Sequence, residues 1–183
     1  MSNLLEVNNI SKRIKGKEIL KGISFNLEQG KVLGIMGPNG QGKTTLLNVI
    51  QGFLKADNGE IKINGNPQSA LTKNDISFLQ DANIFNKSMR IKDAINLYVD
   101  FFDDFDKEKV NYYLDFMNLD SSSRIKDLSK GMMEKFNLSL ALSRKAKLYM
   151  LDEPISGVDP VAREKILDAI LENLSEDSSM IIT

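Results

Sequence analysis

The stretch from Val32 to Ile50, VLGIMGPNGQGKTTLLNVI, decides the fold. Its first five residues form a compact apolar run of the kind found in buried parallel strands. The pattern turns helical from about Gly42 and ends at Gly52, a typical helix stop. A buried strand, a glycine-rich loop and a helix in this order predict an α/β fold, with a ligand-binding loop at the carboxyl end of the strand.

The loop of this stretch matches the phosphate-binding pattern G-x-x-x-x-G-K-[ST]. Glycines let backbone N–H groups turn inward, so that the loop and the helix N-terminus form a cradle for an oligophosphate. Lys43 can reach the terminal phosphates, and the Thr44 hydroxyl is a hard oxygen ligand suited to Mg²⁺. A chance glycine-rich turn is the alternative, but the flanking strand and helix argue against it. The predicted nucleotide-binding residues are Gly37, Pro38, Asn39, Gly40, Gln41, Gly42, Lys43, Thr44 and Thr45.

A second candidate site follows the apolar run of residues 148–151, where Asp152 and Glu153 stand together. Carboxylates at the carboxyl end of a strand lie where ligands bind in open α/β sheets. Asp152 is suited to hold Mg²⁺, and Glu153 to polarise an attacking water. A strand that simply runs into a polar turn is the alternative. The phosphate loop favours the functional interpretation, because such a loop needs an acidic partner for its metal.

Composition narrows the classes of function. The 183 residues are 42% hydrophobic and 27% charged, which excludes a disordered or low-complexity chain. The absence of Cys and His excludes thiol nucleophiles and a Ser-His-Asp triad. The net charge of −1 gives no global attraction for nucleic acid, so no nucleic-acid partner is expected. We see neither a bilayer-spanning run nor a signal peptide, and we expect a cytosolic protein.

Other elements are predicted from periodicity. Two strands, residues 4–10 and 19–27, should form a hairpin closed by a solvated basic loop around Lys12, Arg13, Lys15 and Lys17. Residues 90–117 read as helical, and residues 129–143 as a helix that is apolar nearly all round and therefore buried. Further strands are predicted at residues 60–64, 76–79, 148–151 and 180–183, and a helix from Pro160.

Over essentially its whole length the chain resembles the ATP-binding subunit of ABC transporters. Residues 37–45 resemble its Walker A loop and residues 148–153 its Walker B; residues 78–80, 128–132 and 156–159 resemble the Q-loop, the signature motif and the D-loop. The resemblance implies an α/β, P-loop NTPase (RecA-like) core sheet with an N-terminal antiparallel β subdomain and an inserted α-helical subdomain. The β subdomain and nucleotide-binding core would comprise residues 1–82 and 136–183, and the helical subdomain residues 83–135.

The resemblance also implies cofactors, further site residues and partners. ATP and Mg²⁺ are the implied cofactors. Gln80 would touch the metal and the attacking water, and Asp159 would belong to the nucleotide site. Ser129 and Gly131 would contact the γ-phosphate of ATP bound by a second ATP-binding subunit, although Ser129 alone reads as an ordinary helix N-cap. An integral membrane subunit would be the other partner. The protein would be cytoplasmic, peripheral on the inner face of the cell membrane.

The sequence departs from the family pattern at several positions. Lys130 and Met132 replace Gly and Gln of the signature, a variant similar to subunits of bacterial exporters that handle peptides or antimicrobial compounds. Ile14 stands where an aromatic residue often stacks on adenine, and Phe25 is a candidate substitute. Ile155 replaces the usual Thr. The family's switch histidine would follow residues 180–183, so we expect a chain truncated before it, which binds nucleotide but hydrolyses it poorly.

Three alternatives stay open from the sequence. A P-loop kinase would share the phosphate cradle but has no use for a Q-loop, a signature helix and a D-loop in series. A soluble ABC-type ATPase acting on ribosomes or DNA ends usually carries tandem cassettes or a long insertion. A regulatory cassette is the third. We expect instead an ATPase that couples Mg-ATP-driven dimer closure to transport by a membrane partner, with export of a peptide, drug or similar solute.

Overall fold

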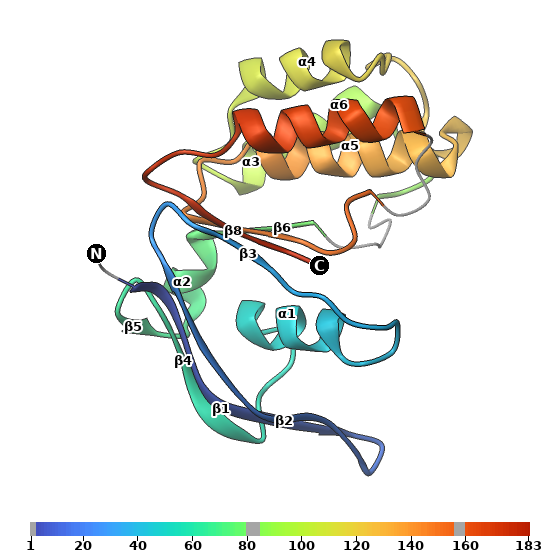
Figure 1. The fold of residues 1–183 in the computed structure, drawn as a ribbon. Helices are drawn as coiled ribbons and strands as arrows, with labels where there is room; N and C mark the ends of the chain where they lie inside the picture. The colour runs from blue at the N-terminus through green and yellow to red at the C-terminus, as the bar shows by residue number, and fades with distance from the viewer. Residues whose placement is uncertain (1–2, 80–84, 156–159) are drawn as a thin grey trace. The chain divides into compact units, whose positions relative to one another are not determined.

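The computed structural model of the protein describes residues 3–79, 85–155 and 160–183 (Figure 1). The chain divides into two compact units. The first comprises Met1–Phe78, Ala146–Asp152 and Leu174–Thr183, and the second Leu79–Lys145 and Glu153–Asn173. Residues 136–145 and 153–173 are thus grouped with the second unit, whereas the sequence interpretation assigned residues 136–183 to the core. The functional subdomain boundaries therefore stay a prediction.

An antiparallel sheet with the strand order β2-β1-β4-β5 forms one part of the first unit. Its strands are β1 (Asn3–Ile14), β2 (Lys17–Glu28), β4 (Asn58–Ile63) and β5 (Asn66–Pro67). The hairpin of β1 and β2 turns at Lys15 and Gly16, whose φ angles are 50° and 80°. Two successive positive φ angles are typical of the two-residue turns that match strand twist. The predicted N-terminal hairpin is confirmed, and it is longer than expected.

The basic residues near this turn do not form the solvated loop that the sequence suggested. Lys12 and Arg13 lie within β1, which continues to Ile14. The ammonium of Lys12 lies 2.8 Å from Oδ1 of Asp57, and the backbone N–H of Arg13 donates to Oδ2 of the same carboxylate at 2.6 Å. The interpretation of these two residues as part of a turn was wrong, because the pairing of β1 with β2 continues to Ile14. Arg13 is exposed as expected, whereas Lys12 is half-buried.

A second sheet carries the strand order β3-β8-β7-β6. Its strands are β3 (Val32–Gly34), β8 (Ser179–Ile182), β7 (Leu148–Leu151) and β6 (Ile76–Leu79). β8 pairs in parallel with β3 on one side and β7 on the other. All four residues of β7 are buried, as the apolar run predicted. The loops that follow β3 and β7, and Thr183 after β8, therefore lie at the carboxyl ends of these strands, where open α/β sheets bind ligands.

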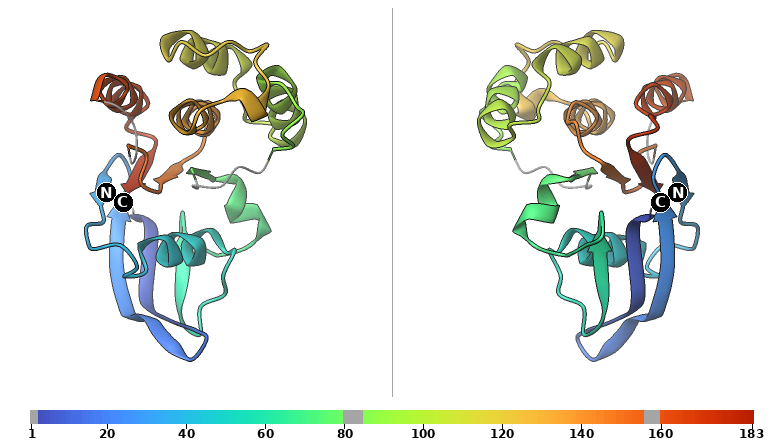
Figure 2. Two further views of the ribbon diagram at one scale, coloured as in Figure 1. Left: turned by 90° about the vertical axis from the view of Figure 1, so that its right-hand side faces the viewer. Right: turned by 90° about the vertical axis from the view of Figure 1, so that its left-hand side faces the viewer.

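Helix α1 (Lys43–Gln51) links the two sheets through one hydrophobic core. Leu46, Leu47, Val49 and Ile50 are its buried residues, and they join a cluster with side chains of both sheets, such as Val7 and Met150. The views of Figures 1 and 2 place α1 against one face of the antiparallel sheet. The short helix α2 (Ala70–Asn74) was not predicted; a capping box between Ser69 and Thr72 starts it.

The second unit is helical. It contains α3 (Ile91–Phe101), α4 (Lys107–Phe116), a 3₁₀ turn at Ile125–Asp127, α5 (Lys130–Leu142) and α6 (Pro160–Glu172). Helix α5 packs against α3, α4 and α6. It is buried throughout only in its last turns, from Leu138 to Leu142, whereas residues 131–135 are half-buried. Among the residues that the structure describes, no helix combines the length and apolarity needed to cross a membrane.

Aromatic side chains fix the loop that joins α3 to α4. Phe102 lies 4.0 Å below the guanidinium of Arg144, and that guanidinium makes two hydrogen bonds with the carboxylate of Asp104. Phe85 packs against Tyr98 and Phe136. Phe101, in contrast, is 78% exposed. The turn after α3 is therefore packed, whereas Phe101 at the end of α3 lies at the surface.

Candidate functional site

The predicted phosphate loop leaves β3 at Gly34 and enters α1 at Lys43. Gly40 and Gly42 adopt positive φ angles of 79° and 95°. A Cβ on Gly42 would lie only 2.8 Å from Cγ2 of Ile19, so this position needs glycine for both its backbone conformation and its close packing. Gly42 is also the N-cap of α1, where no side chain caps the helix. The first turn therefore presents backbone N–H groups of the kind that bind anions.

Lys43 points back into the loop. Its ammonium donates to the carbonyl oxygen of Gly37 at 2.8 Å and to that of Pro38 at 3.3 Å. These contacts hold the charge next to the uncapped helix end. Residues 37–41 and Thr44 are exposed, and Gly42, Lys43 and Thr45 are half-buried. The loop thus places the Lys43 ammonium and exposed backbone where an anionic ligand can reach them.

Asp152 stands at the carboxyl end of β7, in the same unit as the loop. It is 7% exposed, and its Oδ1 accepts a hydrogen bond of 2.7 Å from the hydroxyl of Thr183, which follows β8. Since β8 lies between β3 and β7, Asp152 and the loop emerge from two strands separated only by β8. The sequence analysis did not single out Thr183. Its signal was a hydroxyl placed directly after a buried parallel strand.

The oxygen donors of this edge fit Mg²⁺. Within the described ranges, no three His, Cys, Asp or Glu residues gather into a metal-binding group. Thr44 and Asp152 offer one hydroxyl and one carboxylate, both hard oxygen ligands. Mg²⁺ keeps several waters and is usually held by one or two carboxylates plus substrate phosphates, so this sparse donor set suits a metal that arrives with a nucleotide.

Glu153 has an unusual backbone. Its φ angle is 47°, a left-handed conformation that few non-glycine residues adopt, and its side chain is half-buried. Such conformations cluster at functional sites, where the surrounding structure holds them. Glu153 is grouped with the second unit, whereas Asp152 belongs to the first. The strand and the two carboxylates are as expected, and the catalytic assignment of Glu153 stays a prediction.

The signature residues begin helix α5. Ser129 is the N-cap, and its hydroxyl accepts the backbone N–H of Met132 at 3.2 Å. Lys130 pairs with Glu134 one turn along, at 3.6 Å. A Cβ on Gly131 would meet no atom within 4 Å, so glycine here leaves open space. Ser129 and Gly131 lie in the second unit, and the loop of residues 37–45 in the first.

The proposed roles of several further residues stay predictions. Gln80 and Asp159 lie outside the described residues. Phe25 is half-buried and packs against the hydrophobic core of the first unit, and its role as a platform for adenine stays a prediction. Ile14, 37% exposed, ends β1 next to the hairpin turn.

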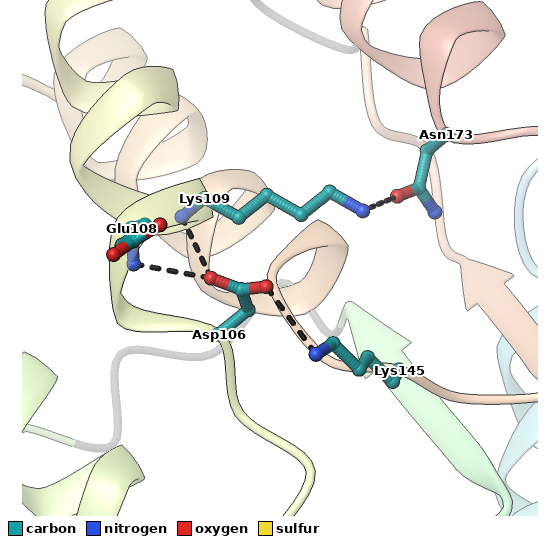
Figure 3. A network of polar contacts seen from close by, with 5 residues as sticks. All are labelled: Asp106, Glu108, Lys109, Lys145 and Asn173. Carbon is teal, nitrogen blue, oxygen red and sulfur yellow. Dashed lines mark hydrogen bonds and ion pairs between the residues drawn. The ribbon is translucent and has the colours of Figure 1, made fainter.

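Sequence analysis did not predict a polar cluster that lies in the second unit (Figure 3). Asp106 caps α4 by accepting the backbone N–H groups of Glu108 and Lys109, and its second oxygen lies 3.5 Å from the ammonium of Lys145. The hydrogen bond from Lys109 chiefly lowers the pKa of Asp106. Burial lowers the pKa of the Lys109 side chain, whose ammonium donates to Oδ1 of Asn173. The cluster ties the start of α4 to the chain after α6.

Comparison with known proteins identifies the family of this chain. A family model described as "ABC transporter" matches residues 20–156. The ABC transporter ATP-binding protein YtrB of Bacillus subtilis is 30% identical over 98% of this chain and 63% of its own length. The Nod factor export ATP-binding protein I of Rhizobium etli is 28% identical over 98% of this chain and 59% of its own length. The chain thus spans less than two thirds of these relatives.

A solved structure from Pyrococcus furiosus, described as an ABC transporter ATP-binding protein, superimposes with a TM-score of 0.84. It is 31% identical, and the match covers 98% of this chain and 90% of that one. The expected resemblance and the P-loop α/β fold are confirmed. With its family match over most of the sequence, its antiparallel and parallel sheets and its glycine-rich loop before α1, the chain belongs to the ABC transporter family of ATP-binding proteins.

Proposed function

We propose that this chain is the ATP-binding and ATP-hydrolysing part of an ABC exporter. The observation that carries the proposal is the start of α1: a left-handed Gly42, an uncapped first turn and a lysine ammonium held at the same loop. This is the geometry that binds an oligophosphate. Proteins of this family generally bind and hydrolyse ATP, which supports the same assignment.

Each residue of the site has a role in the proposal. The backbone of residues 37–45 cradles the phosphates, and Lys43 leaves the loop carbonyls to contact the terminal phosphates. Thr44 and Asp152 would hold Mg²⁺, with Gln80 as a further ligand. When bound, Mg²⁺ neutralises phosphate charge. Glu153 accepts a proton from the attacking water, and Gln80 orients that water. Catalysis of this kind depends mostly on positioning and electrostatic stabilisation.

The proposal includes a dimer. Ser129 and Gly131 begin a helix whose N-terminus carries free N–H groups and the positive end of the dipole. We assign them to the γ-phosphate of ATP bound by a second ATP-binding subunit, together with Asp159. ATP would then be enclosed between two subunits, and closure would move an attached membrane subunit. ABC ATP-binding proteins of transporters generally dimerise and work with membrane permease subunits, which supports this arrangement.

Export is the proposed direction of transport, and a peptide, drug or similar solute the proposed cargo. Support comes from a relative named for Nod factor export and from Lys130 and Met132 in the signature. In this role the protein would be cytoplasmic and would lie at the inner face of the cell membrane, bound to its membrane partner.

One titration tests the proposal. The chain is titrated with Mg-ATP and, separately, with the non-hydrolysable analogue AMP-PNP, while affinity, oligomer size and phosphate release are followed together. We expect saturable binding of both nucleotides with a shift from monomer to dimer. Absence of nucleotide binding by the folded chain would overturn the proposal, and binding without any change in oligomer size would remove its dimer.

A further inference from the structure

The hydroxyl of Thr183 occupies a fixed place at the carboxyl edge of the parallel sheet. The backbone N–H of Thr183 donates to the carbonyl oxygen of Leu151 at 3.1 Å, so the pairing of β8 with β7 continues up to this residue. On the opposite side of β8, the backbone N–H of Ile35 donates to the carbonyl oxygen of Ile182 at 2.8 Å. Backbone contacts therefore hold the end of β8 between β3, which leads into the phosphate loop, and β7, which precedes Asp152.

From this place the side chain reaches Asp152. Oγ1 of Thr183 donates to Oδ1 of Asp152 at 2.7 Å, and Asp152 is 7% exposed. Hydroxyl-to-carboxylate hydrogen bonds of this length belong to the stronger class in proteins. Because the bond engages one carboxylate oxygen, it restricts the rotation of the carboxylate and with it the directions open to Oδ2.

The residue type at this position matters. Threonine is β-branched, and its two heavy atoms on Cβ restrict rotation about χ1 more than the side chain of serine does. A restricted rotamer on a backbone fixed from both sides gives the hydroxyl one direction. Hydrogen-bond partners that orient a metal ligand typically change metal affinity by roughly 10- to 100-fold when they are removed.

We propose that Thr183 is a positioning residue for Asp152: its hydroxyl orients the carboxylate toward the Mg²⁺ that accompanies the nucleotide. The inference rests on the proposed function, because it assigns Asp152 to the metal. It adds a residue outside the loop of residues 37–45 to the set that governs Mg²⁺ affinity. The third strand of this edge, β8, then contributes to the site as β3 and β7 do.

The test compares nucleotide affinity with and without the metal. The dissociation constant of AMP-PNP is measured calorimetrically in Mg²⁺ and in EDTA. The ratio of the two constants gives the gain in affinity due to Mg²⁺. Thr183→Val keeps the shape but removes the donor. We expect it to lower the gain by roughly 10- to 100-fold and to leave the affinity in EDTA unchanged. Thr183→Ser, which keeps the donor, should restore most of the gain.

Ser179→Ala is the matched control. Ser179 is a buried residue at the start of the same strand, where its hydroxyl donates to the carbonyl oxygen of Glu28 at 2.9 Å. The Ser179→Ala variant should be less stable than the wild type, but Mg²⁺ should increase its affinity for AMP-PNP as much as it does in the wild type. If Thr183→Val does not fold, Thr183→Ala removes the same donor without a methyl group against the carboxylate and is measured instead.

Two outcomes would contradict the inference. A folded variant that lacks the donor but keeps the wild-type gain in affinity would overturn the inference alone. A wild-type protein whose affinity does not depend on Mg²⁺ would overturn the assignment of the metal to this site, and the inference with it.

Discussion

The ammonium of Lys43 donates to the carbonyl oxygen of Gly37 at 2.8 Å, so the lysine of the phosphate loop holds the first residue of its own loop. In the proposed function this contact must give way to a phosphate when nucleotide binds. A lysine held by two carbonyl oxygens is oriented in advance, which reduces the conformational entropy lost on binding.

Replacing Lys43 with alanine separates its role in binding phosphate from its role in holding the loop. We expect Lys43→Ala to lose measurable ATP binding at micromolar concentrations, because the point charge that reaches the terminal phosphates is gone. Its thermal stability should stay close to that of the wild type, since the lost contacts lie at an exposed loop. Calorimetric titration and thermal unfolding monitor the two effects. Lys62→Ala, which removes a half-buried lysine paired with Glu60 in the same unit, is the control and should bind normally. Micromolar affinity in Lys43→Ala would contradict the assigned cradle.

Gly42→Ala should destabilise the first unit by about 1 to 3 kcal/mol. The φ angle of 95° is strained for any residue with a Cβ, and the new Cβ would lie 2.8 Å from Cγ2 of Ile19. Gly131→Ala provides the contrast, because Gly131 is helical and surrounded by open space. It should raise stability by about 0.5 to 1 kcal/mol. Chemical denaturation measures both, and equal effects of the two substitutions would contradict the strain at Gly42.

Glu153→Gln tests the proposed general base. The amide keeps the size of the side chain but cannot accept the proton of an attacking water, so ATP should still bind while its hydrolysis is lost. The variant should accumulate as a nucleotide-bound dimer. Phosphate release and light scattering in Mg-ATP provide the measurements, and Glu164→Gln on α6 is the matched control. Hydrolysis at the wild-type rate in Glu153→Gln would exclude this residue as the base.

Ser129→Asp distinguishes a helix cap from a phosphate contact. Aspartate is as good an N-cap as serine, so the stability of the helical unit should change little, whereas Ser129→Ala should cost about 0.5 to 2 kcal/mol. The carboxylate would repel a γ-phosphate presented by a second subunit. We therefore expect Ser129→Asp to bind ATP as a monomer and to fail in dimer formation. If its dimer forms as readily as that of the wild type, Ser129 is a cap and no more.

The pH dependence of stability should depend on Asp106. Its pKa lies below the ordinary value of 3.8, chiefly because the backbone N–H of Lys109 donates to the carboxylate. A depressed pKa adds stability that is fully present above the unfolded value and is lost as the pH falls through the folded value. Unfolding free energies measured in urea should thus decline as the pH falls below about 4.

Asp106→Asn, which keeps an N-cap but removes the charge, should show a flatter decline with acid. Asp57→Asn in the first unit is the comparison, because the hydrogen bond from Lys12 chiefly lowers the pKa of Asp57. The double variant should be flatter than either single one. An acid profile of Asp106→Asn that coincides with the wild type would rule out this contribution.

Much of the nucleotide-binding core could be predicted because its signals are local. The run of residues 32–50 contains the strand, the turn glycines and the helix within one segment, and both Gly42 and the buried face of α1 follow from it. The prediction that this strand is buried was wrong, because β3 ends at Gly34 and lies at the edge of its sheet, with Val32 exposed. The N-cap role of Ser129 is local as well, since its hydroxyl bonds three residues along. Motif order along the chain then identified the family.

What sequence reasoning missed depends on partners distant in the chain. Lys12 and Arg13 read as a solvated turn because their partner, Asp57, is 45 residues from Lys12. The bond from Thr183 to Asp152 spans 31 residues and arises only because β7 and β8 are neighbours in the sheet. Phe101 and Phe102 are adjacent and alike in sequence. Phe102 is half-buried because it packs against the guanidinium of Arg144 and the ring of Tyr98, whereas Phe101 is exposed.

The central place of β8 has a consequence for how the protein forms during synthesis. The hairpin of β1 and β2 can pair as soon as both strands have left the ribosome, because its turn has two residues. β3 pairs with β8, a strand about 150 residues later in the chain, and β7 also pairs with β8. Contacts of such long sequence separation form slowly and late. Until residues 179–182 emerge from the ribosome, the strand edges of β3 and β7 that pair with β8 stay unpaired. Such edges promote aggregation, so the nascent chain should depend on chaperones at that stage.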